Sequence, residues 1–150
     1  MTDALLAYAH FASLIVMVAL LAVELAVCRP GAAGLTLPRL RRIDAAYGAF
    51  AALTLGSGVA RVLWGAKGSA YYLANPIFHT KVTLFVAVGL LSILPTVQFS
   101  KWTAAFRRDV RFVPTPQSIL RVRKLIMIQM LLLAFIPLAA TLMARGIGHA

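Results

Sequence analysis

The chain has 150 residues, of which 61% are hydrophobic and only 13% are charged, about half the charged share of roughly 25% in soluble proteins. Fifteen lysines and arginines against four acidic residues give a formal net charge of +11. This composition excludes an acidic disordered tail, and the single cysteine, Cys28, excludes a scaffold held by internal disulfides. Because the basic residues lie between long apolar runs, the pattern is typical of an integral membrane protein.

Four segments are apolar enough to cross the hydrocarbon core of a bilayer as helices, which takes roughly 20 residues each. In chain order they are Ala4–Cys28, Ala45–Trp64, Ile77–Phe99 and Leu125–Ala144. A backbone in lipid must satisfy its own N–H and C=O groups, so the segments are predicted as α-helices. The first lacks the basic start and the cleavage site of a signal peptide, so we expect it to stay in the mature protein. The sequence predicts an all-α fold, an integral membrane four-helix bundle that forms a single domain over residues 1–150.

Basic residues are concentrated in the first and third connections between these segments. The two connections hold eleven of them: Arg29, Arg39, Arg41, Arg42, Lys101, Arg107, Arg108, Arg111, Arg121, Arg123 and Lys124. Because basic residues favour the cytoplasmic side, we expect loops one and three to be cytoplasmic and both termini to lie on the outer side. Such clusters can also bind nucleic acid, but this layout favours contact with the lipid bilayer and its anionic headgroups, and no nucleic-acid partner is predicted.

Ionisable residues inside the spans are costly in lipid, so each is expected to have a partner, a cavity or a function. Towards the outer side, the first three spans carry His10, Arg61 and Lys81, each on a stripe of polar or small residues at helical spacing. We expect these stripes to face one another inside the bundle. Arg61 and Lys81 either extend to the headgroups or hold an anionic ligand such as a carboxylate. His10 is either a hydrogen-bonded packing residue or a metal or haem ligand.

Two acidic residues, Glu24 and Asp44, lie towards the inner side of the first two spans. We expect them to form structural ion pairs with Arg29, Arg41 or Arg42 that fix the ends of the helices. The alternative for Glu24 is a place on a proton path. In the fourth span, Gln129 is expected to hydrogen-bond between helices.

Six features stand out along the chain: the segment Arg41-Arg42-Ile43-Asp44, the run GVARVLWG at residues 58–65, the pair Lys67-Gly68, the pair Asn75-Pro76, Lys81, and the ending MARGIG at residues 143–148. With these features most of the chain resembles an uncharacterised family of small bacterial inner-membrane proteins, a family of unknown function. The resemblance implies a location in the bacterial inner (plasma) membrane and a four-span topology, and it implies no activity.

His10 in the first span and Lys81 in the third, within the segment FHTKVTL at residues 78–84, resemble the functional pair of the HemJ-type protoporphyrinogen oxidases. These are small membrane proteins that bind haem b. The resemblance implies a haem- or porphyrin-binding pocket in the outer half of the bundle, with His10 as the axial metal ligand and Lys81 as the opposite ligand or a propionate partner. By its charge, Arg61 is a candidate clamp for a propionate. Ser92 stands where that family often has a further histidine, so the oxidase activity is not carried over.

Three functions are therefore predicted as alternatives. The first is a haem- or porphyrin-binding membrane protein with a redox role. The second is a non-enzymatic accessory or assembly subunit of a larger membrane complex, with a membrane-protein partner or a second copy of the chain. The third, a small transporter, is disfavoured because the sequence has no internal repeat. No motif of soluble enzymes is present, such as a Gly-rich phosphate loop or zinc-spaced cysteines, and the sequence leaves open whether the chain is an enzyme.

Overall fold

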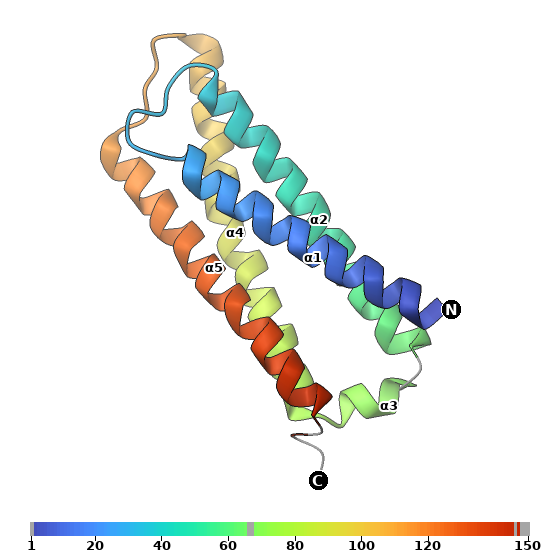
Figure 1. Cartoon of the computed structure of the whole chain (residues 1–150). Helices are drawn as coiled ribbons and strands as arrows, with labels where there is room; N and C mark the ends of the chain where they lie inside the picture. The colour runs from blue at the N-terminus through green and yellow to red at the C-terminus, as the bar shows by residue number, and fades with distance from the viewer. Residues whose placement is uncertain (1, 66–67, 146, 148–150) are drawn as a thin grey trace.

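The computed structural model describes residues 2–65, 68–145 and 147. Over this range the chain is all-helical, with the five helices α1 (Thr2–Val27), α2 (Thr36–Trp64), α3 (Gly68–Leu73), α4 (Pro76–Arg108) and α5 (Pro116–Ala144) (Figure 1). Four of them are long and apolar enough to cross a membrane, and the fifth, α3, has six residues. The predicted all-α fold with four spanning helices is confirmed, whereas α3 was not predicted.

Three of the long helices extend nine residues beyond one end of their predicted spans, whereas α1 begins only two residues before Ala4. α2 and α5 begin earlier than Ala45 and Leu125, the predicted starts of their spans, and α4 continues past Phe99, its predicted end. The added turns are rich in arginine and also contain two lysines, and both residue types are good helix formers. A hydropathy pattern detects only the part of a helix that suits lipid, so it misses turns that continue into the headgroup layer.

The prediction that the basic residues lie in loops is therefore corrected. Nine of the eleven basic residues assigned to loops one and three lie on the extended ends of α2, α4 and α5. Of these eleven, only Arg29 and Arg111 lie between helices. Most of this positive charge thus lies on the surfaces of helices, where the helical geometry of the backbone sets the position of each basic residue.

The starts of α4 and α5 are capped by side chains. The Oδ1 atom of Asn75 accepts a hydrogen bond from the backbone N–H of Ile77 at 2.9 Å, and Pro76 occupies a first-turn position that needs no N–H. Thr115 plays the same part for α5, where its hydroxyl oxygen accepts from the backbone N–H of Ser118 at 3.3 Å. These caps fix where each helix begins.

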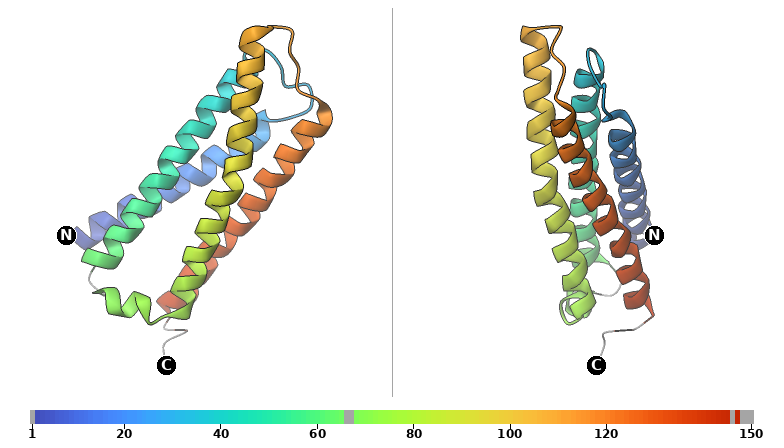
Figure 2. Two further views of the ribbon diagram at one scale, coloured as in Figure 1. Left: turned by 180° about the vertical axis from the view of Figure 1, so that it is seen from behind. Right: turned by 90° about the vertical axis from the view of Figure 1, so that its left-hand side faces the viewer.

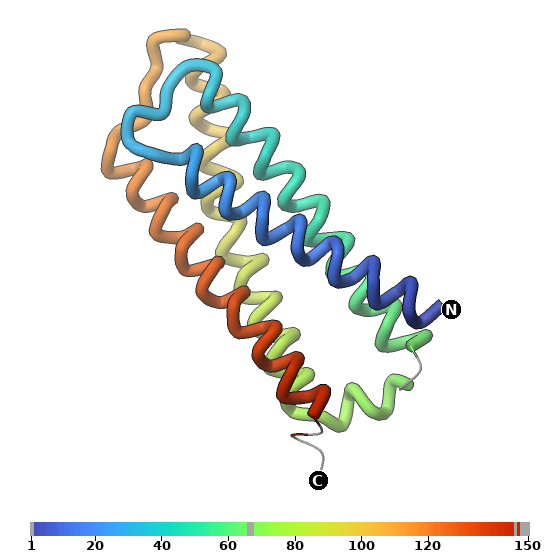
Figure 3. Tube along the Cα trace, in the orientation of Figure 1, coloured from blue at the N-terminus to red at the C-terminus, as the bar shows by residue number. Residues whose placement is uncertain are grey.

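The helices form two antiparallel pairs, α1 with α2 and α4 with α5, which pack against each other (Figures 1 and 2). The short helix α3 links the pairs where α1 begins and α5 ends, and we call this the α3 end of the bundle. The α1–α2 and α4–α5 connections lie together at the opposite end, as the chain trace shows (Figure 3). Because most of the basic residues gather there, we call it the arginine end.

The buried core lies between the helix pairs, and apolar side chains also cover the outside of the bundle. Core side chains that are at most 1% exposed come from all four long helices: Met17, Leu21, Leu37, Leu40, Phe99, Ile119 and Ile126. Facing outward, Ile15 is 68% exposed and Leu90 is 63% exposed. Apolar side chains this exposed on every long helix suit contact with lipid tails rather than water.

Candidate functional site

His10 is held against α2 by two polar groups of that helix. Its Nδ1 atom lies 3.0 Å from the carbonyl oxygen of Thr54 and 3.2 Å from the hydroxyl oxygen of Ser57. Gly58 leaves room for the imidazole, because a Cβ atom at this position would lie 3.1 Å from Cε1 of His10. One turn further along α1, Ser13 accepts a hydrogen bond from the Thr54 hydroxyl at 3.0 Å. The α1–α2 contact near the α3 end is therefore polar and closely fitted.

This arrangement determines which ring nitrogen of His10 carries the proton. A carbonyl oxygen can only accept a hydrogen bond, so Nδ1 is the N–H that donates to Thr54. In the neutral ring Nε2 is then the nitrogen with a lone pair, and it has no hydrogen-bond partner among the residues that the structure describes. Histidines that bind metals are commonly oriented in this way, with one nitrogen donating to a carbonyl and the other coordinating.

Two cations, Arg61 on α2 and Lys81 on α4, lie within electrostatic range of His10. The guanidinium carbon of Arg61 is 5.4 Å from the centre of the Phe11 ring, and its Nε atom is buried with no hydrogen-bond partner in the described part of the chain. Lys81 is directed towards α5, where its Nζ atom lies 3.2 Å from the sulfur of Met143. The structure brings His10 and Arg61 together on one helix pair and places Lys81 on the other.

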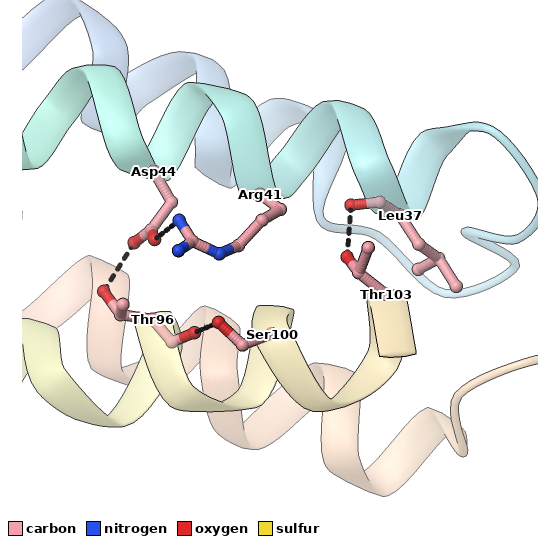
Figure 4. Close-up of polar contacts among 6 residues, drawn as sticks. All are labelled: Leu37, Arg41, Asp44, Thr96, Ser100 and Thr103. Carbon is pink, nitrogen blue, oxygen red and sulfur yellow. Dashed lines mark hydrogen bonds and ion pairs between the residues drawn. The ribbon is translucent and has the colours of Figure 1, made fainter. Parts of the chain in front are cut away.

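Nearer the arginine end, Asp44 forms a polar contact between α2 and α4 (Figure 4). Its Oδ2 atom lies 3.5 Å from Nη1 of Arg41, and its Oδ1 atom accepts a hydrogen bond from the Thr96 hydroxyl at 2.7 Å. Arg41 is one of the three predicted partners, whereas Arg42 is exposed and forms no ion pair within the described residues. Sequence reasoning missed Thr96, because a threonine in an apolar run carries no signal of what it binds.

Glu24 differs from the sequence prediction, which gave it an arginine partner. The side chain is 1% exposed, its Oε1 atom has no hydrogen-bond partner, and no ion pair forms with it in the described ranges. It follows Leu21 on the core-facing stripe of α1, whereas Arg29 is exposed beyond the end of that helix. The nearby acidic residue Asp44 does not compensate for this, because its own carboxylate is bound to Arg41 and Thr96.

Two further contacts join the helix pairs across the core. The Tyr47 hydroxyl of α2 donates to Oε1 of Gln129 on α5 at 3.3 Å, so Gln129 does bond between helices. Arg123 of α5 donates from Nη1 to the carbonyl oxygens of Leu25 and Cys28, both at 2.6 Å. This arginine supplies a positive charge to the last turn of α1, which has no basic residue of its own. Its capping role was not predicted, because nothing in the sequence relates it to α1.

The long apolar helices and the buried polar contacts between them define an integral membrane protein. Residues 2–148 match a family described as predicted membrane protein (DUF2214). The match covers nearly the whole chain, so the protein belongs to this family, and the resemblance to an uncharacterised membrane-protein family is confirmed. No curated protein and no solved structure matches the chain.

Proposed function

We propose that this protein binds haem b or a related porphyrin in the half of the bundle near the α3 end, where it serves a redox role. His10 would hold the iron through Nε2, and Arg61 and Lys81 would pair with the propionates. When bound, the iron would supply one-electron chemistry. The protein would supply the ligand, a setting screened from water, and positive charge.

One observation carries the proposal: α2 binds the Nδ1 side of His10 through the Thr54 carbonyl, which leaves the lone pair of Nε2 for a ligand. The position of Arg61 supports it. A buried guanidinium nitrogen without a hydrogen-bond partner is costly, and a carboxylate ligand would offset that cost. Nε2 of His10 and the guanidinium group of Arg61 together thus suit a ligand that carries both a metal ion and a carboxylate.

The experiment is a visible absorption spectrum of the protein purified in detergent after expression with added haem. We expect a Soret band in the wild type and in the His79→Ala variant, and its loss in His10→Ala. His79 is a matched control because it is exposed and bonds locally, with its Nε2 atom 2.9 Å from the carbonyl oxygen of Leu73. A colourless wild-type protein, or equal loss of the band in both variants, would overturn the proposal.

The same preparation separates the alternative functions. A colourless chain that co-purifies and cross-links with a larger membrane complex would favour the accessory or assembly subunit. A colourless chain whose proteoliposomes show solute or ion flux, lost in Lys81→Gln, would favour the small transporter. Either outcome would exclude haem binding as the function of the protein.

We also propose that the arginine end faces the cytoplasm of a bacterial cell and that both termini lie outside, because basic residues are retained on the cytoplasmic side. Single-cysteine variants in a Cys28→Ala background test this. Ser69→Cys on α3 should react with a membrane-impermeant maleimide in intact cells, and Asp109→Cys only after the membrane is opened. The reverse pattern would overturn the orientation. Both positions are exposed at opposite ends of the bundle.

A further inference from the structure

A groove of about 730 Å³ lies between α2 and α4 at the arginine end. Two arginines from each helix line it, together with two small hydroxyl side chains and two alanines: Arg41, Arg42, Arg107, Arg108, Ser100, Thr103, Ala45 and Ala104. The residues come from segments far apart in the sequence, and the polar contacts in Figure 4 lie along the same interface. The site therefore exists only in the folded bundle.

The groove has much more positive than negative charge. Of its four arginines, Arg41 is paired with Asp44 at 3.5 Å, and it is the only one of the four with an ion pair in the part of the chain described. Arg42, Arg107 and Arg108 are exposed. Like charges brought together in a groove repel one another, so the arrangement is relieved by an anion.

The hydroxyl groups in the groove do not supply the donors for that anion. Ser100 donates to the carbonyl oxygen of Thr96 at 2.9 Å, and Thr103 donates to the carbonyl oxygen of Leu37 at 3.3 Å (Figure 4). Their protons are used in holding α4 together and in joining it to α2. The guanidinium groups are the donors that remain, and their planar fork matches the oxygens of a phosphate.

The depth of the groove indicates which source of phosphate it meets. Helical rise is about 1.5 Å per residue, so Arg41 and Arg42 lie roughly 5–6 Å outside the predicted start of the second span at Ala45. The headgroup layer on one side of a bilayer is about 5–8 Å thick. The arginines of α2 thus lie at the level of lipid phosphates. Arg107 and Arg108 of α4 lie roughly 12–14 Å past Phe99, on the aqueous side of that level, and line the same groove from there.

We propose that this groove binds the headgroup of an anionic phospholipid, whose phosphodiester is held by the guanidinium groups of α2 and α4. Ala45 and Ala104, which are exposed small residues, leave the groove open for the glycerol end of the lipid. The inference is independent of the haem proposal, because it uses other residues at the opposite end of the bundle.

The test measures binding of short-chain phosphatidylglycerol, and of phosphatidylcholine for comparison, to the full-length protein in detergent by native mass spectrometry and thermal unfolding. We expect retention of phosphatidylglycerol and a higher melting temperature with it, and neither effect with phosphatidylcholine. The double variant Arg42→Gln/Arg107→Gln should lose about tenfold or more in affinity, since each basic residue contributes appreciably to anionic-lipid binding.

The matched control is Arg121→Gln/Lys124→Gln, which removes the same charge from exposed positions on α5 that do not line the groove. Its affinity for phosphatidylglycerol should equal that of the wild type, because the charges it removes lie outside the groove. Equal loss in both double variants would overturn the proposal, as would equal binding of the two lipids. If inorganic phosphate or a short oligonucleotide protects the protein as well as phosphatidylglycerol does, the groove is a general anion site and the lipid assignment is wrong.

Discussion

The carbonyl oxygen of Thr54 lies 3.0 Å from Nδ1 of His10, so α2 determines how the histidine of α1 is turned. The ring can take this position because Gly58 has no side chain to meet Cε1. The orientation of the candidate metal ligand therefore depends on a residue that would never bind the metal itself.

Replacing Gly58 by leucine should displace the His10 ring and reduce haem affinity by about tenfold or more, which is the usual effect of disturbing a residue that orients a ligand. Gly56→Leu is the matched control, since nothing lies within 4 Å of a Cβ added at Gly56. Haem titration followed at the Soret maximum measures both. Unchanged affinity in Gly58→Leu would show that the ring position has no part in binding.

Arg123→Gln should lower the free energy of unfolding by about 2 kcal/mol, because two charge-assisted hydrogen bonds to the last turn of α1 are lost. Chemical unfolding in detergent followed by circular dichroism measures the change. Arg121→Gln provides the comparison, as Arg121 is an exposed arginine on the same helix. A similar loss in both variants would mean that net charge, and not the cap, stabilises the protein.

Glu24→Met should raise the free energy of unfolding by about 1–2 kcal/mol. The reason is that a buried carboxyl group, whose Oε1 has no hydrogen-bond partner among the described residues, is replaced by an apolar side chain of similar shape. Asp44→Ala should lower it by about 2 kcal/mol, since this substitution removes the contacts of Asp44 with both Arg41 and Thr96. The two acidic residues are thus expected to respond in opposite directions. A loss of stability in Glu24→Met would point to a function for its carboxyl group in the fold.

Tyr47→Phe should cost about 1–2 kcal/mol of stability, because Oε1 of buried Gln129 loses its donor. In the Gln129→Leu background the same substitution should cost much less, which gives a coupling energy of about 1 kcal/mol between the two residues. Independent effects in this double-mutant cycle would show that the hydrogen bond does not contribute.

The sequence predicted the helical class, because runs of apolar residues long enough to cross a bilayer allow few other structures. It placed the helix ends less well. Lys101, Arg107 and Arg108 are polar enough to suggest a loop, yet they continue α4. The helix propensity of basic side chains, which a hydropathy pattern ignores, accounts for the difference.

The candidate site was predicted by residue type and not by contact. His10 and Asp44 stood out because ionisable groups are costly in lipid, but their hydrogen-bond partners Thr54 and Thr96 did not. Glu24 was assigned an arginine that the fold places elsewhere. Spacing along one helix gives the face on which a residue lies, whereas its partners depend on how the helices are rotated against one another.

Four sets of hydrogen bonds described here join the two helix pairs, and all lie between the middle of the bundle and the arginine end. They run from Thr96 to Asp44, from Tyr47 to Gln129, from Thr103 to Leu37 and from Arg123 to the end of α1. Nearer the α3 end, the bond from His10 to Thr54 stays within one pair. At that end the pairs are linked by α3, whose Tyr71 hydroxyl donates to the carbonyl oxygen of Met143 on α5 at 3.5 Å. The site proposed for haem thus lies in the half of the bundle where none of the hydrogen bonds described here joins the four long helices across the two pairs.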